Sequence, residues 1–226
     1  MIRFNATAGA ALMAASVFIA PVARAATDEQ QIVDRAVITI NDMRSDKEFG
    51  TAPDLMRRAR AVLIVPQIFK AGFFFGGEGG SGVLMARGPN GWSDPAFYTI
   101  GSASFGLQIG AQASELVLFI MTDKALNAVL HNDFKLGADA GLTVVTLGSG
   151  VSASTAGNPA ADIIGWASSS GAYAGISLEG SVLKPRDSYN AAYYGRAVTP
   201  RDIVLRRNVS NHAAARLQQA LGTAGS

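Results

Sequence analysis

The chain of 226 residues contains no cysteine and only two histidines, His131 and His212. The lack of cysteine excludes disulfides, thiol catalysis and a lipid anchor on an N-terminal cysteine. Two isolated imidazoles argue against a histidine metal site, and the chain has no Gly-x-Ser-x-Gly nucleophile elbow. We therefore expect a protein that is not an enzyme and that holds neither a cofactor nor a metal. Paired carboxylates remain as formal acid–base candidates: Glu78 with Asp94, or Glu115 with Asp139.

Once the N-terminal residues are set aside, the chain also has no excess of positive over negative charge. Arg3 precedes an apolar stretch at residues 6–20, and residues 23–25 (ARA) match an A-x-A cleavage site, which is the pattern of a secretory signal. We expect cleavage between Ala25 and Ala26 and a periplasmic or secreted protein; an uncleaved membrane anchor is the alternative. The remainder carries 17 basic and 17 acidic residues. Nucleic acid is therefore not an expected partner, and an anion must be bound by a local basic patch.

After residue 25 the chain has no apolar run long enough to cross a bilayer. The longest runs, residues 61–65 and 116–121, have the length of strands. About 200 residues suit one domain, which we expect over 26–226, with a core at about 53–205 and helical extensions at 27–47 and 199–221.

Hydrophobic periodicity and breaker residues predict helices, then a long β region, then helices again. This order favours an α+β fold with an antiparallel sheet or barrel-like core, on which the N- and C-terminal helices pack. Helices are expected at 28–46, from Ala52, after an Asp123 cap, at 187–194, from Thr199 and at 210–221, where Gly222 ends the last one. Strands are expected at 61–65 (ended by Pro66), 82–87, 96–100, 115–122, 142–147, 163–167 and 172–183, with a hairpin turn at 87–91.

The segment 70–95 combines three phenylalanines, Phe73, Phe74 and Phe75, with a glycine cluster. Glycine loses much conformational freedom on folding, so five of them in strand-like sequence must serve close backbone approach or unusual dihedral angles. The cluster contains a literal match to the dinucleotide fingerprint, Gly77-x-Gly79-x-x-Gly82. That fingerprint requires a helix after the glycines, and none is expected here. We interpret the segment as a glycine-rich strand or loop that binds a ligand without catalysing its cleavage.

Basic residues flank this segment. Arg57, Arg58 and Arg60 precede the first predicted strand, and Lys70 precedes the phenylalanines. Cations beside exposed aromatic rings are what an anionic membrane surface attracts, so we predict a lipid-binding site from Arg57, Arg58, Arg60, Lys70, Phe73, Phe74 and Phe75. The alternative is that the arginines lie on a solvated helix face and that the phenylalanine rings are part of the core. The 28–46 helix carries five acids, so docking on the β core is favoured over membrane contact.

The glycine–aromatic segment and a series of later motifs resemble the SYLF domain. The likeness covers about residues 53–205, and the later motifs follow in order: 106–110 (GLQIG), 115–121 (ELVLFIM), 135–139 (KLGAD), 171–175 (GAYAG), 177–181 (SLEGS), 194–195 (YG) and 198–200 (VTP). The resemblance implies phospholipid binding, with phosphoinositides as the eukaryotic ligand, and actin binding in the eukaryotic relatives.

For an exported chain, the resemblance implies recognition of anionic phospholipid or phosphoinositide-like head groups. A second reading is a structural or interaction protein of the cell envelope that assembles through glycine-rich strands. The sequence does not distinguish binding on a bilayer from capture of one lipid in a cavity, and the oligomeric state is open.

Overall fold

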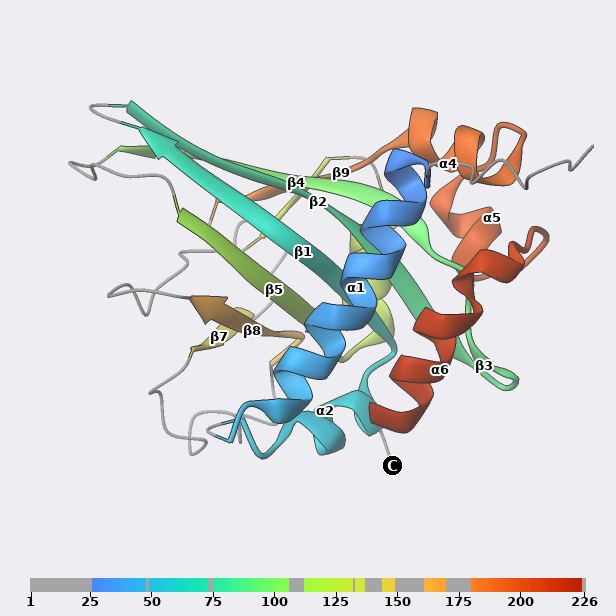
Figure 1. Ribbon diagram of the computed structural model, residues 1–226, viewed down its shortest axis with the longest axis horizontal. Helices are drawn as coiled ribbons and strands as arrows, with labels where there is room; N and C mark the ends of the chain where they lie inside the picture. The colour runs from blue at the N-terminus through green and yellow to red at the C-terminus, as the bar shows by residue number, and fades with distance from the viewer. Residues whose placement is uncertain are drawn as a thin grey trace, which may run out of the picture.

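The computed structural model describes residues 26–47, 49–72, 75–105, 112–131, 133–136, 144–148, 161–169 and 180–224. A curled, mostly antiparallel sheet carries helices from both ends of the chain (Figure 1). The predicted α+β class with an antiparallel core is therefore confirmed. The predicted signal at residues 1–25 lies outside the described residues, as do most of the motifs at 106–110 and 171–181.

Nine strands form the described sheet, in the order β6-β9-β4-β2-β1-β5-β8-β7 with β3 paired to β2. Every pairing is antiparallel except that of β7 with β8. The strands are β1 (Ala61–Gly72), β2 (Phe75–Gly88), β3 (Gly91–Trp92), β4 (Ala96–Phe105), β5 (Gln112–Ile120), β6 (Phe134–Lys135), β7 (Val144–Gly148), β8 (Ile163–Ser169) and β9 (Val182–Pro185).

The helices pack on both faces of this sheet. They are α1 (Asp28–Ser45), α2 (Ala52–Arg58), α3 (Asp123–Val129), α4 (Asp187–Tyr194), α5 (Pro200–Val204), a 3-10 turn (His212–Ala214) and α6 (Ala215–Ala224). Among the described residues, none of these helices combines the length and apolar content that crossing a bilayer requires.

Alternation along β1 divides the core into two layers. Leu63 and its alternate neighbours pack with α3 and α5 on one face. Val62 and Ile64 pack with α1, α2 and α6 on the other face, and Figure 1 shows α1 and α6 crossing it. Helix α1 starts at a Thr27 cap, whose hydroxyl accepts from the Gln30 amide at 3.3 Å. Its buried side includes Ala36 and Ile40, so the predicted docking on the β core is confirmed.

Pro66 does not end the first strand, contrary to the sequence prediction. The register of β1 shifts between Ile64 and Gln67 against β2, and between Val65 and Ile68 against β5. Proline has no amide hydrogen to donate, and a β-bulge is where a strand accommodates it. β1 therefore continues to Gly72, and β1 and β2 project together to the upper left, away from both ends of α1 (Figure 1).

Three predicted helix ends also differ from the structure. Thr122, not Asp123, caps α3, and its hydroxyl accepts from the Ala125 amide at 3.1 Å. The sequence predicts the last helix from residue 210, but Asn211 caps the turn that precedes α6. The last helix runs past Gly222 to Ala224, because its buried Leu221 and Ala224 pack against the core and outweigh the low helix propensity of glycine.

The glycines of β2 permit the bulge of β1 to pass close by. A Cβ atom on Gly80 would lie 2.8 Å from Val65 Cγ1, and one on Gly82 would lie 2.9 Å from Val65 Cγ2. Such distances require the neighbouring chain to move, so the predicted close backbone approach is confirmed at these positions. Gly79 differs, because a Cβ there would meet only the Ile100 carbonyl oxygen, at 3.5 Å.

Gly80→Ala should lower the free energy of unfolding by about 1–3 kcal/mol, since its methyl group would press on the β1 backbone and on Val65. Gly79→Ala, one residue away in the same strand, should change it by less than about 0.5 kcal/mol. Urea unfolding of residues 26–226 measures both. Equal stability of the two variants would show that the bulge does not constrain β2.

Candidate functional site

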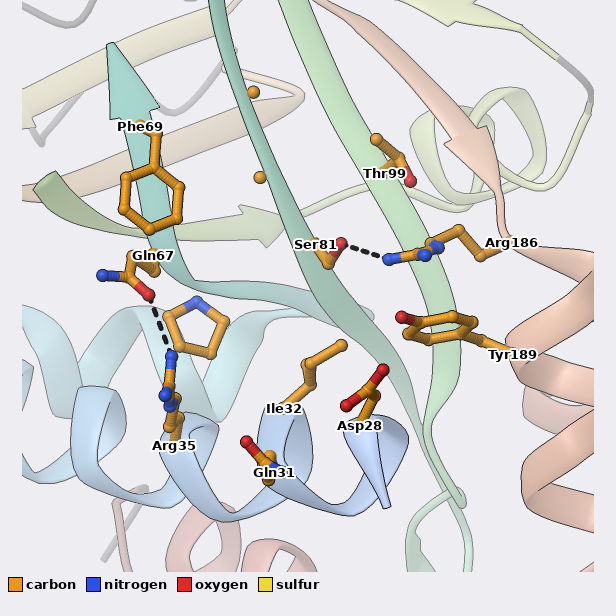
Figure 2. A pocket seen from close by; sticks show the side chains of 13 residues that line it. Asp28, Gln31, Ile32, Arg35, Gln67, Phe69, Ser81, Thr99, Arg186 and Tyr189 are labelled. Carbon is orange, nitrogen blue, oxygen red and sulfur yellow. Dashed lines mark hydrogen bonds between the residues drawn. The ribbon is translucent and has the colours of Figure 1, made fainter. Parts of the chain in front are cut away.

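A groove of about 590 Å³ opens where α1, the hairpin and α4 meet (Figure 2). We call it the β2 groove and define it by Arg35, Phe69, Gly79, Ser81, Arg186 and Tyr189, which line it with a few neighbours. Its volume falls in the range of about 300–1,000 Å³ that is typical of small-molecule sites.

The groove is hollow because its floor carries little side-chain volume. Gly79, Gly80 and Ser81 of β2 form the floor, with Thr99 of the adjacent β4. The register of β1 shifts at Pro66, and Pro66, Gln67 and Phe69 line one wall. Gly79, which shares the groove face of β2 with Ser81, therefore leaves space above the strand.

Arg186 stands on the α4 side of the groove and is held in place by neutral groups. One of its guanidinium nitrogens donates to Ser81 Oγ at 2.6 Å, and the guanidinium lies 3.4 Å from the centre of the Tyr189 ring. Its backbone amide donates to the Phe97 carbonyl at 2.8 Å. Stacking and hydrogen bonding together fix the guanidinium and leave other donors on its fork available.

Arg35 enters the groove from α1 on the opposite wall. Its guanidinium donates to Gln67 Oε1 at 2.9 Å (Figure 2). Among the described residues, neither Arg35 nor Arg186 has a carboxylate within 4 Å. Two cations with neutral partners in one concave site form a candidate anion site.

An apolar rim borders this groove. Phe69 of β1 is 56% exposed and Ile38 of α1 is 57% exposed, which is high for such large side chains. Ile38 lines a second hollow of about 290 Å³ with Thr39 and Glu115, and this hollow shares Arg35 and other wall residues with the β2 groove. Arg35 therefore lines both hollows beside these exposed apolar side chains, and Arg186 lies across the groove from it.

The structure separates the residues of the predicted lipid site. Arg57 and Arg58 lie on α2 and Arg60 just before β1, whereas Lys70 is near the far end of β1, about 30 Å away at the rise of an extended strand. Phe73 and Phe74 lie outside the described residues, and Phe75 begins β2. The backbone positions of Lys70 and Phe75 are therefore far from Arg57, Arg58 and Arg60.

Two of the three predicted arginines are paired with acids. Arg57 contacts Asp54 within α2, and Arg60 lies 3.5 Å from Asp123. Arg58 is exposed. Arg57 and Arg60 therefore present less unpaired charge than the groove arginines. Sequence reasoning missed Arg35, because it lies in an acidic helix, and Arg186 and Tyr189, because their proximity to β2 depends on the sheet order.

Asp94 and Glu115, two of the formal acid–base candidates, are hydrogen-bonded to structural partners. Asp94 accepts from the Asn211 amide at 2.9 Å, and burial raises the pKa of its carboxyl. Asp139 lies outside the described residues. His131 and His212 are exposed. Within the described ranges, no group of three His, Cys, Asp or Glu side chains is placed to hold a metal ion.

Comparison with known proteins gives a family match. The profile of Ysc84, described as "Las17-binding protein actin regulator", matches residues 101–224. The chain is similar to "LAS seventeen-binding protein 3" of Saccharomyces cerevisiae, at 30% identity over 177 residues, covering 75% of this chain and 38% of the yeast protein.

Animal proteins give a similar result. "SH3 domain-containing YSC84-like protein 1" of Homo sapiens is 33% identical over 152 residues, covering 66% of this chain and 44% of the human protein. The mouse protein of the same name is 34% identical over 144 residues, covering 63% and 42%. The chain thus spans less than half the length of these relatives.

Glu115, which lines the hollow beside the groove, should make stability depend on pH. Burial raises the pKa of its carboxyl above the usual 4.5, and a hydrogen bond from Thr39 at 2.6 Å offsets part of this rise. A raised carboxyl pKa contributes stability that is present below the usual value and is lost as the pH rises through the folded-state pKa.

Glu115→Gln removes this titration, so the variant should lose less stability than the unsubstituted protein between about pH 4 and about pH 7. Thr39→Val should do the reverse, because it removes the interaction that lowers the pKa. Urea unfolding at the two pH values tests both. Parallel pH profiles for all three proteins would contradict the assignment.

Proposed function

The chain belongs to the Ysc84 (SYLF) family, and we propose that it is an exported, non-enzymatic protein that binds membranes containing anionic phospholipid. The family description names an actin regulator and no catalytic activity. The signal predicted at residues 1–25 supports export, and the chemistry of the groove supports phospholipid as the partner.

The observation that supports lipid binding most strongly is the pair Arg35 and Arg186. Both line one groove, both are positioned by neutral oxygen atoms, and exposed Phe69 borders them. Phosphate groups of a bilayer attract the guanidinium groups, and the phenyl ring enters the interface between head groups and acyl chains.

The hairpin extends this surface toward the predicted lipid-binding residues. The backbone of Lys70 follows Phe69 directly in β1, and Phe73, Phe74 and Phe75 come next in the sequence. We include Lys70 and these rings in the proposed membrane contact. A lipid contact through Arg57, Arg58 and Arg60, at the other end of β1, remains a separate prediction, and the same experiments test it.

Binding to actin or to a Las17-like protein is a further proposal drawn from the relatives. Their names record Las17 binding in yeast and an SH3 domain in the animal proteins. The chain spans less than half of these proteins, so any such activity must be tested on this chain itself. For an exported protein, contact with actin becomes relevant only if the protein reaches a host cell.

Assembly through the glycine-rich segment 76–82 is not favoured. β2 lies between β1 and β4 and is paired with both along this segment, so its backbone groups are not free for strand addition. Size-exclusion mass of the lipid-free protein tests assembly by other surfaces.

Co-sedimentation of residues 26–226 with liposomes tests the proposal. The protein should bind anionic vesicles and not zwitterionic vesicles, and binding should weaken with salt. The double variant Arg35→Gln/Arg186→Gln should bind about thirtyfold more weakly, at about 1 kcal/mol for each cation near the surface.

The matched control is Arg57→Gln/Arg60→Gln, which removes the same charge from paired arginines and should retain most binding. A third variant, Arg57→Glu/Arg58→Glu/Lys70→Glu, tests the site predicted from sequence. Loss of binding in the control, with full binding in the groove variant, would move the site to α2. No binding by the unsubstituted protein to any vesicle would refute the proposal.

A further inference from the structure

We infer that the β2 groove takes in a single phosphodiester head group of a glycerophospholipid, and that Gly79 sets the depth of this site. The inference rests on the proposed function and goes further, because it distinguishes capture of one head group from adsorption to a charged surface. Four features of the groove carry it: its charge, its donor geometry, its floor and its rim.

The charge of the groove matches one phosphodiester. Arg35 and Arg186 contribute two positive charges, and Asp28 at the start of α1 contributes one negative charge. The net single positive charge is balanced by a phosphodiester, which carries one negative charge. A head group with additional phosphate monoesters would bring further negative charge close to Asp28, and like charges repel in a partly desolvated site.

The guanidinium groups are already positioned for an anion. Ser81 and Tyr189 fix Arg186, and Gln67 fixes Arg35. Each of these side-chain hydrogen bonds uses one donor of a guanidinium that has five, and its planar fork suits two phosphate oxygens at once. Side chains that are ordered before binding lose little conformational entropy on binding, so a small head group can be held with useful affinity.

The floor at Gly79 is open for a reason other than packing. The β2–β4 register runs without interruption through this region, so Gly79 faces the same side as Ser81, whose hydroxyl meets Arg186 in the groove. A Cβ at Gly79 would contact only the Ile100 carbonyl oxygen, at 3.5 Å, whereas Gly80 and Gly82 are required by the bulge. The strand tolerates a side chain at Gly79, but the groove would be filled by it.

The rim places the groove at the membrane interface. Phe69 borders the groove and Ile38 borders the adjoining hollow, and both are more than half exposed. A lipid whose head group lies between Arg35 and Arg186 would have its glycerol and acyl chains beside these side chains. The apolar part of the lipid could therefore stay in the bilayer.

The first test titrates residues 26–226 with deacylated phosphatidylglycerol, glycerophosphoglycerol, in a calorimeter. The unsubstituted protein should bind this head group, and Gly79→Val should bind it at least about tenfold more weakly, because a filled floor prevents charge-assisted hydrogen bonds to the phosphate. Gly79→Ala is the intermediate variant, and urea unfolding verifies that both variants fold. Inorganic phosphate, titrated in parallel, distinguishes a lipid head group from free phosphate.

The second test uses vesicles. Gly79→Val should reduce binding to phosphatidylglycerol vesicles, although it changes no charge. Asp28→Asn should strengthen binding to vesicles that contain phosphatidylinositol bisphosphate, compared with phosphatidylglycerol vesicles of equal surface charge, because it removes the repelling carboxylate.

The outcomes separate the two claims. If Arg35→Gln/Arg186→Gln loses vesicle binding while Gly79→Val keeps it, the protein binds the charged surface and the inference of head-group capture is overturned. Binding of inorganic phosphate as tight as that of glycerophosphoglycerol also overturns it. If the unsubstituted protein binds no vesicle, the proposed function itself fails.

Discussion

The close passage of β1 over β2 at the Pro66 bulge is the constraint on which the rest of the structure depends. Proline cannot donate to the ladder, so β1 shifts its register there against both neighbours. The displaced backbone lies so close to β2 that Gly80 and Gly82 have no room for a side chain. The same bulge carries Gln67 and Phe69 toward the α1 side, where they meet Arg35 and border the groove.

The two arginines of the groove matter for anion binding because their partners are neutral groups. Most exposed ion pairs contribute little, because each charge is compensated locally and screened by salt. Arg57 and Arg60 are paired in this way. Arg35 and Arg186 are instead oriented by an amide, a hydroxyl and an aromatic ring. Their positive charge remains available to an incoming anion, as the proposed lipid contact requires of a chain whose charges balance after residue 25.

Much of the fold could be predicted from the sequence because local patterns agreed with tertiary packing. The apolar stripe and Thr27 cap identified α1, the Thr199 cap followed by Pro200 identified α5, and the turn at 87–91 identified the β2–β3 hairpin. The continuation of β1 past Pro66 could not be predicted, because a proline ends a strand in most settings. Only the neighbouring glycines indicate that another strand passes close by.

The candidate site was less accessible to sequence reasoning. The glycine cluster correctly indicated a place of close approach, but Arg35 and Arg186 are separated by about 150 residues and meet only through the sheet order. The basic residues that are close in sequence, Arg57, Arg58 and Arg60, lie at the end of β1 opposite to Lys70. Proximity along the chain is a poor guide here, because an extended strand separates neighbours by about 3.3 Å per residue.

The central claim is that the groove side of the molecule faces the bilayer. The absence of cysteine allows a single label at any chosen position, so an environment-sensitive dye can be attached to Phe69→Cys or, separately, to Leu205→Cys. Both positions are exposed, at 56% and 42%, but Leu205 follows α5, which packs on the opposite face of the sheet. On addition of anionic vesicles, the dye at position 69 should shift to the blue and the dye at position 205 should not. A shift at position 205 alone would contradict the account.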